Sequence, residues 1–431
     1  METDKSFYNL TPFAILRDPA NGGFSLVSPK GKIMSSTRDE IESLISLHGT
    51  QEPGEPPSGL VRAAMDNGLI AIDGKISSPP FQPGKIIENL KETRFQILTL
   101  TDIVVSTGKQ CNYNCNGCST ESGPRAADEK IIPEIRAAIL ESSQFGAINL
   151  GFTGGEPLLP HNIANMDYLC REAKKSGFEN ISCATNGTYV PHYSGEIKKM
   201  GISHLILPLH GDSDTAKRYT GHPSPMKNTI NAMAVCREEG INVTVNYVVT
   251  RENILQLSDT VDYVLGLDND SSSLSVFVSP LIPVGRASSL RDNLLDYESY
   301  LALLEQFGNL RQKHGNRVKF ACKNNSVKAA DPIICNAGLI FVSVDSSGTV
   351  SGCDDLAKLD PKGSIHVEPF WAIWNDNTRW DKYRKPLTVN KSCRSCSESA
   401  RSYCFGKCKT LSLARYNSAD MEAKPVTCAI K

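Results

Sequence analysis

Short apolar runs alternate with longer amphipathic stretches between residues 97 and 321. In the stretches between the runs, apolar residues recur at helical spacing, as they do at Ile132, Ile135 and Ile139. Repeated strand–helix units predict a parallel barrel or part-barrel, with its chemistry at the C-terminal ends of the strands. The predicted strands are Ile103–Ser106, Ile148–Phe152, Ile181–Ala184, Leu205–Leu209, Val243–Val249, Leu274–Val278 and Val318–Ala321.

The first ninety residues follow a different pattern. A capping box at Thr37–Glu40 marks the start of a helix with one apolar face. The β-β-α-α-β order of the segment predicts a small winged-helix-like domain over residues 1–90, followed by a proline-rich linker. Its elements are strands at Phe13–Leu16 and Phe24–Val27, the capped helix, a helical piece at Gly59–Met65 and a strand-like edge at Leu69–Ile72.

Composition excludes several classes of partner. A chain of 431 residues exceeds the usual size of one domain, so we expect two or three. A formal net charge of −1 gives no electrostatic case for nucleic acid or an anionic membrane. The sequence has neither a long apolar run nor a signal peptide, so we expect a soluble, cytoplasmic protein.

The cysteines change this picture. Disulfides are rare in a reducing compartment, so fourteen cysteines point to metal ligation. Cys111, Cys115 and Cys118, spaced CxxxCxxC, follow the first predicted barrel strand and therefore lie at the reactive end. Three thiolates can hold a [4Fe–4S] cluster and leave one iron open to a small chelating cofactor. Zinc is the alternative, because soft thiolate sites also select zinc.

The last hundred residues lose the strand–helix rhythm and carry a second set of patterned cysteines. Such a thin core is expected to need more than apolar burial to hold it together, and metal is the natural candidate. The set is Cys335 and Cys353 with Gly348 between them, then Cys393 and Cys396, Cys404 and Cys408, and finally Cys428.

The first cysteine motif resembles the radical SAM (S-adenosylmethionine) superfamily, and the second resembles the SPASM extension of peptide-modifying members. The resemblance covers residues 97–431. It implies a partial (β/α)6 TIM-like barrel over 97–321 and a cysteine-rich iron–sulfur domain over 322–431. It also implies SAM as cofactor, one SAM-binding [4Fe–4S] cluster and two auxiliary clusters.

The same resemblance assigns SAM contacts by position. Gly154, Gly155 and Glu156 of the GGE motif would hold the amino group of SAM, although a plain strand-to-helix turn also explains them. The family has an aromatic residue before the third cysteine to shield adenine, and this chain has Gly117 there, with Tyr113 as no assured substitute. Further implied contacts are Thr185, Asn186, Asn246, the segment Pro283–Ala287 and Arg218, the last against the carboxylate.

The resemblance also divides the second cysteine set between two auxiliary clusters, with zinc as the alternative. Cys322 is the one candidate fourth ligand for the inner cluster, which is otherwise open. The inner ligands would be Cys335, Cys353 and Cys408, and the outer ligands Cys393, Cys396, Cys404 and Cys428. Cys170, Cys183 and Cys236 fall on apolar faces and are expected to be inert core thiols.

Three further residues are candidate catalytic groups. His210 ends the fourth barrel strand at the reactive face, where a structural histidine is the alternative. Asp354 and Asp355 follow a predicted cluster ligand, and one of them is a candidate general base for a substrate radical intermediate. Hydrogen bonding within the loop explains the two aspartates equally well.

Taken with the N-terminal domain, the resemblance implies a peptide maturase. Reductive cleavage of SAM would give a 5′-deoxyadenosyl radical that abstracts hydrogen from a peptide, leading to an oxidative cross-link. The winged-helix-like domain would bind a leader peptide by strand addition, and a flavodoxin or ferredoxin would donate electrons. The alternatives are a sulfatase-maturase-like enzyme that oxidises Cys or Ser to formylglycine, and a non-catalytic iron–sulfur or zinc protein.

Overall fold

The computed structural model describes most of the barrel and parts of both ends. The described residues are 7–10, 14–17, 24–27, 33–51, 58–73, 100–126, 131–268, 273–320, 337–384, Cys408 and Thr410. The predicted ligands that lie outside these residues are Cys322, Cys335, Cys393, Cys396, Cys404 and Cys428.

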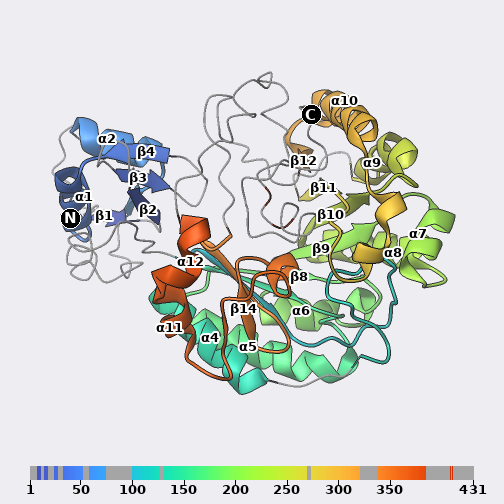
Figure 1. The fold of residues 1–431 in the computed structure, drawn as a ribbon, viewed down its shortest axis with the longest axis horizontal. Coiled ribbons are helices and arrows are strands. Elements are labelled where there is room, and N and C mark those ends of the chain that lie inside the picture. Colours follow the sequence, from blue (N-terminus) through green and yellow to red (C-terminus); the bar gives the residue numbers. More distant parts are fainter. Residues whose placement is uncertain are drawn as a thin grey trace.

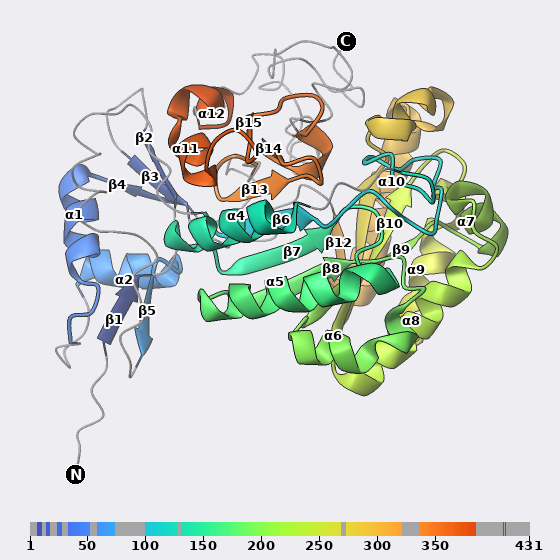
Figure 2. The ribbon, with the colours of Figure 1, turned by 90° about the horizontal axis from the view of Figure 1, so that it is seen from below.

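A ten-stranded sheet organises the molecule, and seven of its strands form the parallel part-barrel. Each predicted strand is confirmed to within a few residues. Figure 2 shows the helices lying outside the curved sheet. The barrel strands, which pair in chain order, are β6 (Asp102–Ser106), β7 (Asn149–Thr153), β8 (Asn180–Ala184), β9 (His204–Leu209), β10 (Asn242–Val249), β11 (Leu274–Pro280) and β12 (Val318–Phe320).

The barrel core is apolar because parallel strands are covered on both faces. In β10, Val243, Val245, Tyr247 and Val249 are all buried. Figure 1 shows the helices placed around the strands. The helices are α4 (Ile132–Gln144), α5 (Ile163–Lys175), α6 (Ser194–Met200), α7 (Ser213–Thr220), α8 (Pro225–Glu239), α9 (Leu257–Gly266) and α10 (Tyr297–His314).

The C-terminal unit extends the barrel sheet rather than standing apart from it. Strand β13 (Phe341–Val344) pairs in parallel with β6, and β14 (Thr349–Ser351) and β15 (Gly363–Ser364) continue the sheet antiparallel. Residues 337–384 also supply buried aromatic side chains to the same core as the barrel. The expectation of a thin core is therefore wrong for this part of the chain. Its buried aromatic residues are Phe370, Trp374, Trp380 and Tyr383.

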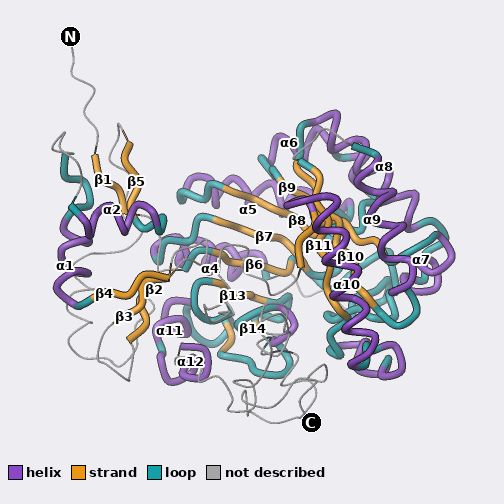
Figure 3. The backbone as a smooth tube through the Cα atoms, turned by 90° about the horizontal axis from the view of Figure 1, so that it is seen from above, coloured by secondary structure: helices purple, strands orange, loops and turns teal. Residues whose placement is uncertain are grey.

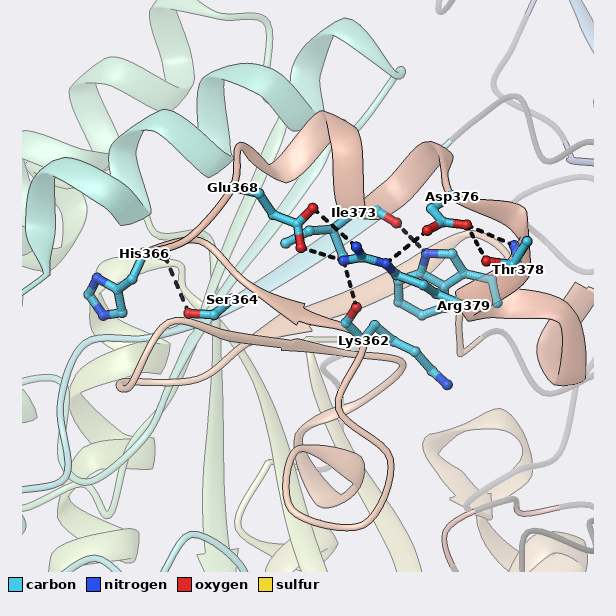
Figure 4. A network of polar contacts seen from close by, with 9 residues as sticks. Lys362, Ser364, His366, Glu368, Ile373, Asp376, Thr378 and Arg379 are labelled. Carbon is cyan, nitrogen blue, oxygen red and sulfur yellow. Dashed lines mark hydrogen bonds and ion pairs between the residues drawn. The ribbon is translucent and has the colours of Figure 1, made fainter.

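A polar network fixes the two short helices of this unit, α11 (Phe370–Asn375) and α12 (Asn377–Arg384). The guanidinium of Arg379 forms ion pairs with Glu368 and Asp376 and donates to the carbonyl of Lys362 at 3.0 Å (Figure 4). One side chain thus ties both helices to the loop after β14. This packing is carried by protein groups alone.

The N-terminal module has a hydrophobic core of its own. The capping box is confirmed, since Glu40 N donates to Thr37 Oγ1 at 3.3 Å and Thr37 N donates to Glu40 Oε2 at 2.7 Å. Figure 3 shows β1 beside β5, apart from the barrel strands. The elements are β1 (Phe7–Leu10), β2 (Ala14–Arg17), β3 (Phe24–Val27), β4 (Ile33–Ser36), α1 (Arg38–Ser46), α2 (Gly59–Asp66) and β5 (Ile70–Asp73).

The β-β-α-α-β order expected for this module is wrong by two strands. The sequence analysis missed β1 and β4, so the observed order is four strands, two helices and a strand. Strands β2, β3 and β4 form an antiparallel meander, whereas β1 pairs with β5 in a separate ladder. Strand β4 ends in Ser35 and Ser36, which weakens its apolar signal. Among the described helices, none is long and apolar enough to cross a bilayer.

Candidate functional site

The cysteine loop follows β6 at the C-terminal end of the barrel, where chemistry was expected. Its two arms are joined, because Cys111 N donates to Gly123 O and Gly123 N donates to Lys109 O, both at 3.2 Å. The middle of the loop is attached to the end of α7: Asn116 N donates to Tyr219 O at 2.8 Å. These backbone contacts fix the loop independently of its thiols.

The three thiols lie close enough to affect one another. Burial, with smaller contributions from the neighbouring cysteines, raises the pKa of Cys111 to about 11 and that of Cys115 to about 12. Such thiols stay protonated unless a bound cation stabilises their thiolate form. The Cys118 sulfur also lies 3.3 Å from the amide nitrogen of Ser122, an N–H donor of the kind that surrounds iron–sulfur clusters. This donor set fits a thiolate-bound cluster.

An iron–sulfur cluster and a single metal ion require different arrangements of their ligand side chains. Within the described ranges, no three His, Cys, Asp or Glu side chains are placed to hold one ion. In a cubane each thiolate binds a different iron, so the three sulfurs need not converge on a point.

The two glycines of the GGE turn are required by the backbone of the cysteine loop. Gly155 N donates to Gly108 O and Glu156 N donates to Gln110 O, both at 2.8 Å. A Cβ atom on Gly155 would lie 1.9 Å from Gln110 O, and one on Gly154 would lie 2.2 Å from the hydroxyl oxygen of Ser106. The turn and the loop therefore form one packed unit.

The carboxylate of Glu156 is fully buried and accepts three hydrogen bonds from the protein. The donors are Thr185 Oγ1 at 2.6 Å, Asn186 N at 2.7 Å and Leu158 N at 3.0 Å. Burial raises the pKa of this carboxyl, and the three donors oppose the rise. Glu156 thus joins the ends of β7 and β8, and its contact with SAM stays a prediction.

Asn186 carries this connection on to the cysteine loop. Its side-chain amide donates to Asn112 Oδ1 at 2.7 Å and lies 3.8 Å from the Cys111 sulfur. Asn186 and the neighbouring Thr185 are both buried. The family resemblance assigned both residues to SAM. The structure brings Asn186 next to the three predicted ligand cysteines, with Thr185 beside it on Glu156.

The space that a side chain at position 117 would occupy is filled from α7. A Cβ atom on Gly117 would lie 2.1 Å from the Tyr219 hydroxyl oxygen. The Tyr219 ring packs against the His210 ring, with centroids 4.1 Å apart. The loop lacks the expected aromatic residue at position 117, but the ring of Tyr219 from α7 lies beside that position. Sequence reasoning did not find this contact.

His210 is buried at the end of β9, as a structural histidine would be. Its Nδ1 atom has no hydrogen-bond partner among the residues that the structure describes, and burial lowers its pKa from 6.5 to about 4. The imidazole is therefore neutral at physiological pH. Its place beside Tyr219 puts it at the barrel mouth.

Two other predicted SAM contacts are engaged with protein groups. Arg218 forms an ion pair with Glu252, and its side chain is 59% exposed. Asn246 Oδ1 accepts from Ser279 Oγ at 3.3 Å, between β10 and β11. The structure does not bring either side chain into contact with the cysteine loop.

The segment after β11 is hydrogen-bonded to the cysteine loop through Arg286. Its backbone N donates to Cys118 O at 3.0 Å, and its guanidinium donates to Cys115 O and Ser122 O, both at 2.7 Å. The preceding Gly285 has a φ of +57°, and a Cβ there would lie 2.2 Å from Ser119 O. Sequence reasoning placed this segment near adenosine but did not single out Arg286.

A cavity of about 290 Å³ opens between the barrel mouth and the C-terminal unit. Ser106 and Thr153 contribute from the ends of β6 and β7, and the cysteine loop contributes Ser119, Thr120 and Glu121. The opposite wall comes from the C-terminal unit. It includes Asp345, Ser346, Asp354, Asp355, Ala357 and Lys358.

The two predicted aspartates line this cavity and are held by serines. Ser343 donates to Asp354, and the side chain of Ser119 lies close enough to the Asp355 carboxyl to oppose the rise in its pKa. Burial raises the pKa of both carboxyls, that of Asp354 to about 6. An ion pair between Glu121 and Lys358 also joins the loop to the C-terminal unit.

Two predicted cluster ligands of the C-terminal unit, Cys353 and Cys408, are among the described residues. Cys353 directly precedes the two aspartates, and its sulfur is 3.3 Å from Thr410 Oγ1. Cys408 is buried in the main core. The structure thus brings Cys353 beside the segment that contains Cys408. Cys170, Cys183 and Cys236 are buried as expected.

Two stretches of the chain match known protein families. Residues 105–264 match the radical SAM superfamily, and residues 335–397 match the SPASM iron–sulfur cluster-binding domain. The chain is a radical SAM enzyme with a SPASM domain. The predicted radical SAM and SPASM assignments are confirmed, as are SAM and its iron–sulfur cluster as cofactors.

Individual relatives of this radical SAM/SPASM enzyme are distant. It is 26% identical to the AdoMet-dependent heme synthase of Methanosarcina barkeri, over 66% of this chain and 85% of that one. Streptococcus suis SuiB, solved bound to precursor peptide SuiA, superimposes with a TM-score of 0.66 at 16% identity, over 98% of each chain. AnSMEcpe, solved with AdoMet and the Cp18Cys peptide, gives 0.58 at 16% identity, over 76% of this chain and 93% of that one.

Proposed function

We propose that this radical SAM/SPASM enzyme oxidatively modifies a peptide, forming a cross-link between or within its side chains. The observation that carries the proposal is the cavity between the cysteine loop and the Asp354–Asp355 wall. A fold shared with SuiB along 98% of each chain, N-terminal module included, supports a peptide as substrate. A volume of about 290 Å³ suits one or two side chains.

The residues around the thiols would hold the cofactors. Cys111, Cys115 and Cys118 would bind the cluster, which when bound supplies the electron that cleaves SAM to a 5′-deoxyadenosyl radical. The GGE turn keeps the loop in place from one side, and Tyr219, which fills the space beside Gly117, would contact the adenine of SAM. The protein's own task is to orient the substrate carbon and exclude water.

The C-terminal unit would complete the reaction. Asp354 and Asp355 line the proposed substrate cavity, so either would take a proton as the product forms. Cys353, which directly precedes them in sequence, would bind the nearer of two auxiliary clusters, with Cys408 and Cys335. We propose a flavodoxin or ferredoxin as electron donor.

The N-terminal module would recruit the substrate. Its β2–β3–β4 meander has two edge strands among the described residues, and an edge strand can accept an extended leader peptide by main-chain hydrogen bonding. Its core is separate from that of the barrel, which suits a recognition unit that acts apart from the chemistry.

Oxidation of a single Cys or Ser to formylglycine is the second candidate. It is favoured by the likeness to anSMEcpe with its bound Cys-containing peptide, but that likeness covers only 76% of this chain.

Two measurements test the proposal. The reconstituted enzyme, given SAM and dithionite, should release 5′-deoxyadenosine, and a precursor peptide should lose two hydrogens in mass as a cross-link forms. Deleting residues 1–90 should abolish leader binding and peptide processing while SAM cleavage continues. Unchanged processing by the shortened enzyme would overturn the recruiting role of the module, and absence of SAM cleavage in the intact enzyme would overturn the whole proposal.

A further inference from the structure

Arg286 makes more contacts with the cysteine loop than any role near adenosine explains. It follows β11, yet it reaches across the barrel mouth to three backbone carbonyls of the loop. Two of these carbonyls belong to Cys115 and Cys118, and the third belongs to Ser122, whose N–H points at the Cys118 sulfur. Arg286 therefore spans the CxxC half of the motif.

The local backbone is built for this approach. Gly285 adopts a φ of +57°, and any side chain there would collide with the carbonyls of Cys118 and Ser119, 2.6 and 2.2 Å from its Cβ position. The close approach brings the Arg286 amide within reach of Cys118 O. Glycine at 285 and arginine at 286 thus act together as one clamp.

The guanidinium also brings charge to the thiols. Its two donated bonds end on carbonyls, and the nearby carboxylate of Glu121 is paired with Lys358. One of those carbonyls belongs to Cys115 and the other to Ser122, whose amide nitrogen lies 3.3 Å from the Cys118 sulfur, so the positive charge lies beside two of the predicted cluster ligands. A fixed cation beside a thiolate-bound cluster favours the state that carries more negative charge.

We infer that Arg286 is a positioning residue that clamps the Cys115–Cys118 half of the loop and raises the reduction potential of the cluster bound there. The inference rests on the proposed cluster at Cys111, Cys115 and Cys118. The redox step is the addition of one electron from an external reductant to that cluster. No covalent bond forms or breaks in it.

The test compares Arg286→Gln, Arg286→Lys and the control Arg291→Gln in reconstituted full-length enzyme. Arg291 is exposed in the next turn of the chain, and within the described part of the chain no hydrogen bond or ion pair joins its side chain to the cysteine loop. The EPR signal that changes when SAM is added identifies the relevant cluster, and its midpoint potential is measured by dithionite titration. Iron loss to a chelator is followed in parallel.

Arg286→Gln should lower the ratio of reduced to oxidised cluster at least tenfold at a given potential, which is about 59 mV for one electron. Arg286→Lys keeps the charge but not the two-pronged donor, so its potential should stay near wild type. Both variants should lose iron several-fold faster than Arg291→Gln.

Two results would count against the inference alone. One is a wild-type potential in Arg286→Gln with its SAM-responsive signal intact, and the other is an equal shift in the Lys and Gln variants. If Arg286→Gln retains no cluster, the Arg286→Lys variant decides. A tenfold or larger fall in its ratio of reduced to oxidised cluster at a given potential would overturn the electrostatic role. Absence of a SAM-responsive signal in the wild-type enzyme would instead overturn the proposed function.

Discussion

The side chain of Ser119 lies close enough to the Asp355 carboxyl to oppose the rise in its pKa, which brings the residue after Cys118 beside the second residue after Cys353. The two walls of the cavity, one in the barrel and one in the C-terminal unit, therefore meet at this pair of side chains, as they do at the ion pair between Glu121 and Lys358. A substrate in the cavity would lie beside this link.

Ser119→Ala should destabilise the enzyme by about 1 kcal/mol, because it removes the polar neighbour that Ser119 provides for the half-buried carboxyl of Asp355. The change is measured as a shift in the urea midpoint. Ser289→Ala is the control, since the exposed Ser289 hydroxyl donates only to Arg286 O in its own turn. Equal midpoints for the two variants would show that the contact contributes nothing.

Gly155→Ala should prevent stable cluster binding. The added methyl group would lie 1.9 Å from Gln110 O, so the cysteine loop must move away from the GGE turn. We expect iron content after reconstitution to fall several-fold. Gly195→Ala is the matched control, because no atom lies within 4 Å of the added methyl group there. Full iron loading of Gly155→Ala would contradict the packing described above.

Glu156→Ala should be more damaging than Glu156→Gln. The alanine leaves the buried amides of Leu158 and Asn186 without an acceptor, at about 1–3 kcal/mol for each group. The glutamine keeps one acceptor oxygen and should lie between alanine and wild type. Urea denaturation measures the order, and the exposed Glu196→Ala serves as control. The reverse order of Gln and Ala would refute the assignment.

His210 should make the fold sensitive to acid. Its pKa is about 4 in the folded protein against 6.5 ordinarily, so between these values the unfolded chain binds a proton that the folded chain does not. The free energy of unfolding should therefore decrease as the pH is lowered. This residue should contribute a decrease of about 2 kcal/mol between pH 7 and pH 5. Both His210→Phe and His210→Gln should remove that part of the pH dependence of the free energy of unfolding, measured by urea titration at several pH values. A slope equal to that of wild type in both variants would exclude the effect.

The barrel could be predicted from sequence because each of its strands is a short, largely apolar run that can be recognised without a distant partner. The predicted strand Val243–Val249 lies within the observed β10. The cysteine loop could be predicted because its residues are adjacent in sequence. The N-terminal module was harder, since a four-residue strand such as β4 carries too few apolar positions to be distinguished from a loop.

Contacts between distant segments could not be predicted in the same way. Arg286 meets Cys115, and Tyr219 meets Gly117, only because the barrel brings the ends of different strands together. The GGE glycines were assigned to a ligand, whereas the structure gives them a protein partner in Gly108 and Gln110. A single sequence shows which residues are small or charged, but it does not show what approaches them.

The parallel pairing of β6 with β13 has a consequence for biosynthesis. Asp102 and Phe341 are register partners although they lie more than half the chain apart. While the chain emerges from the ribosome, the outer edge of the first barrel strand stays unpaired until the C-terminal unit is made. An open strand edge invites pairing with other chains. We therefore expect nascent or truncated chains that end before residue 341 to need chaperones, and cluster insertion to follow completion of the whole polypeptide.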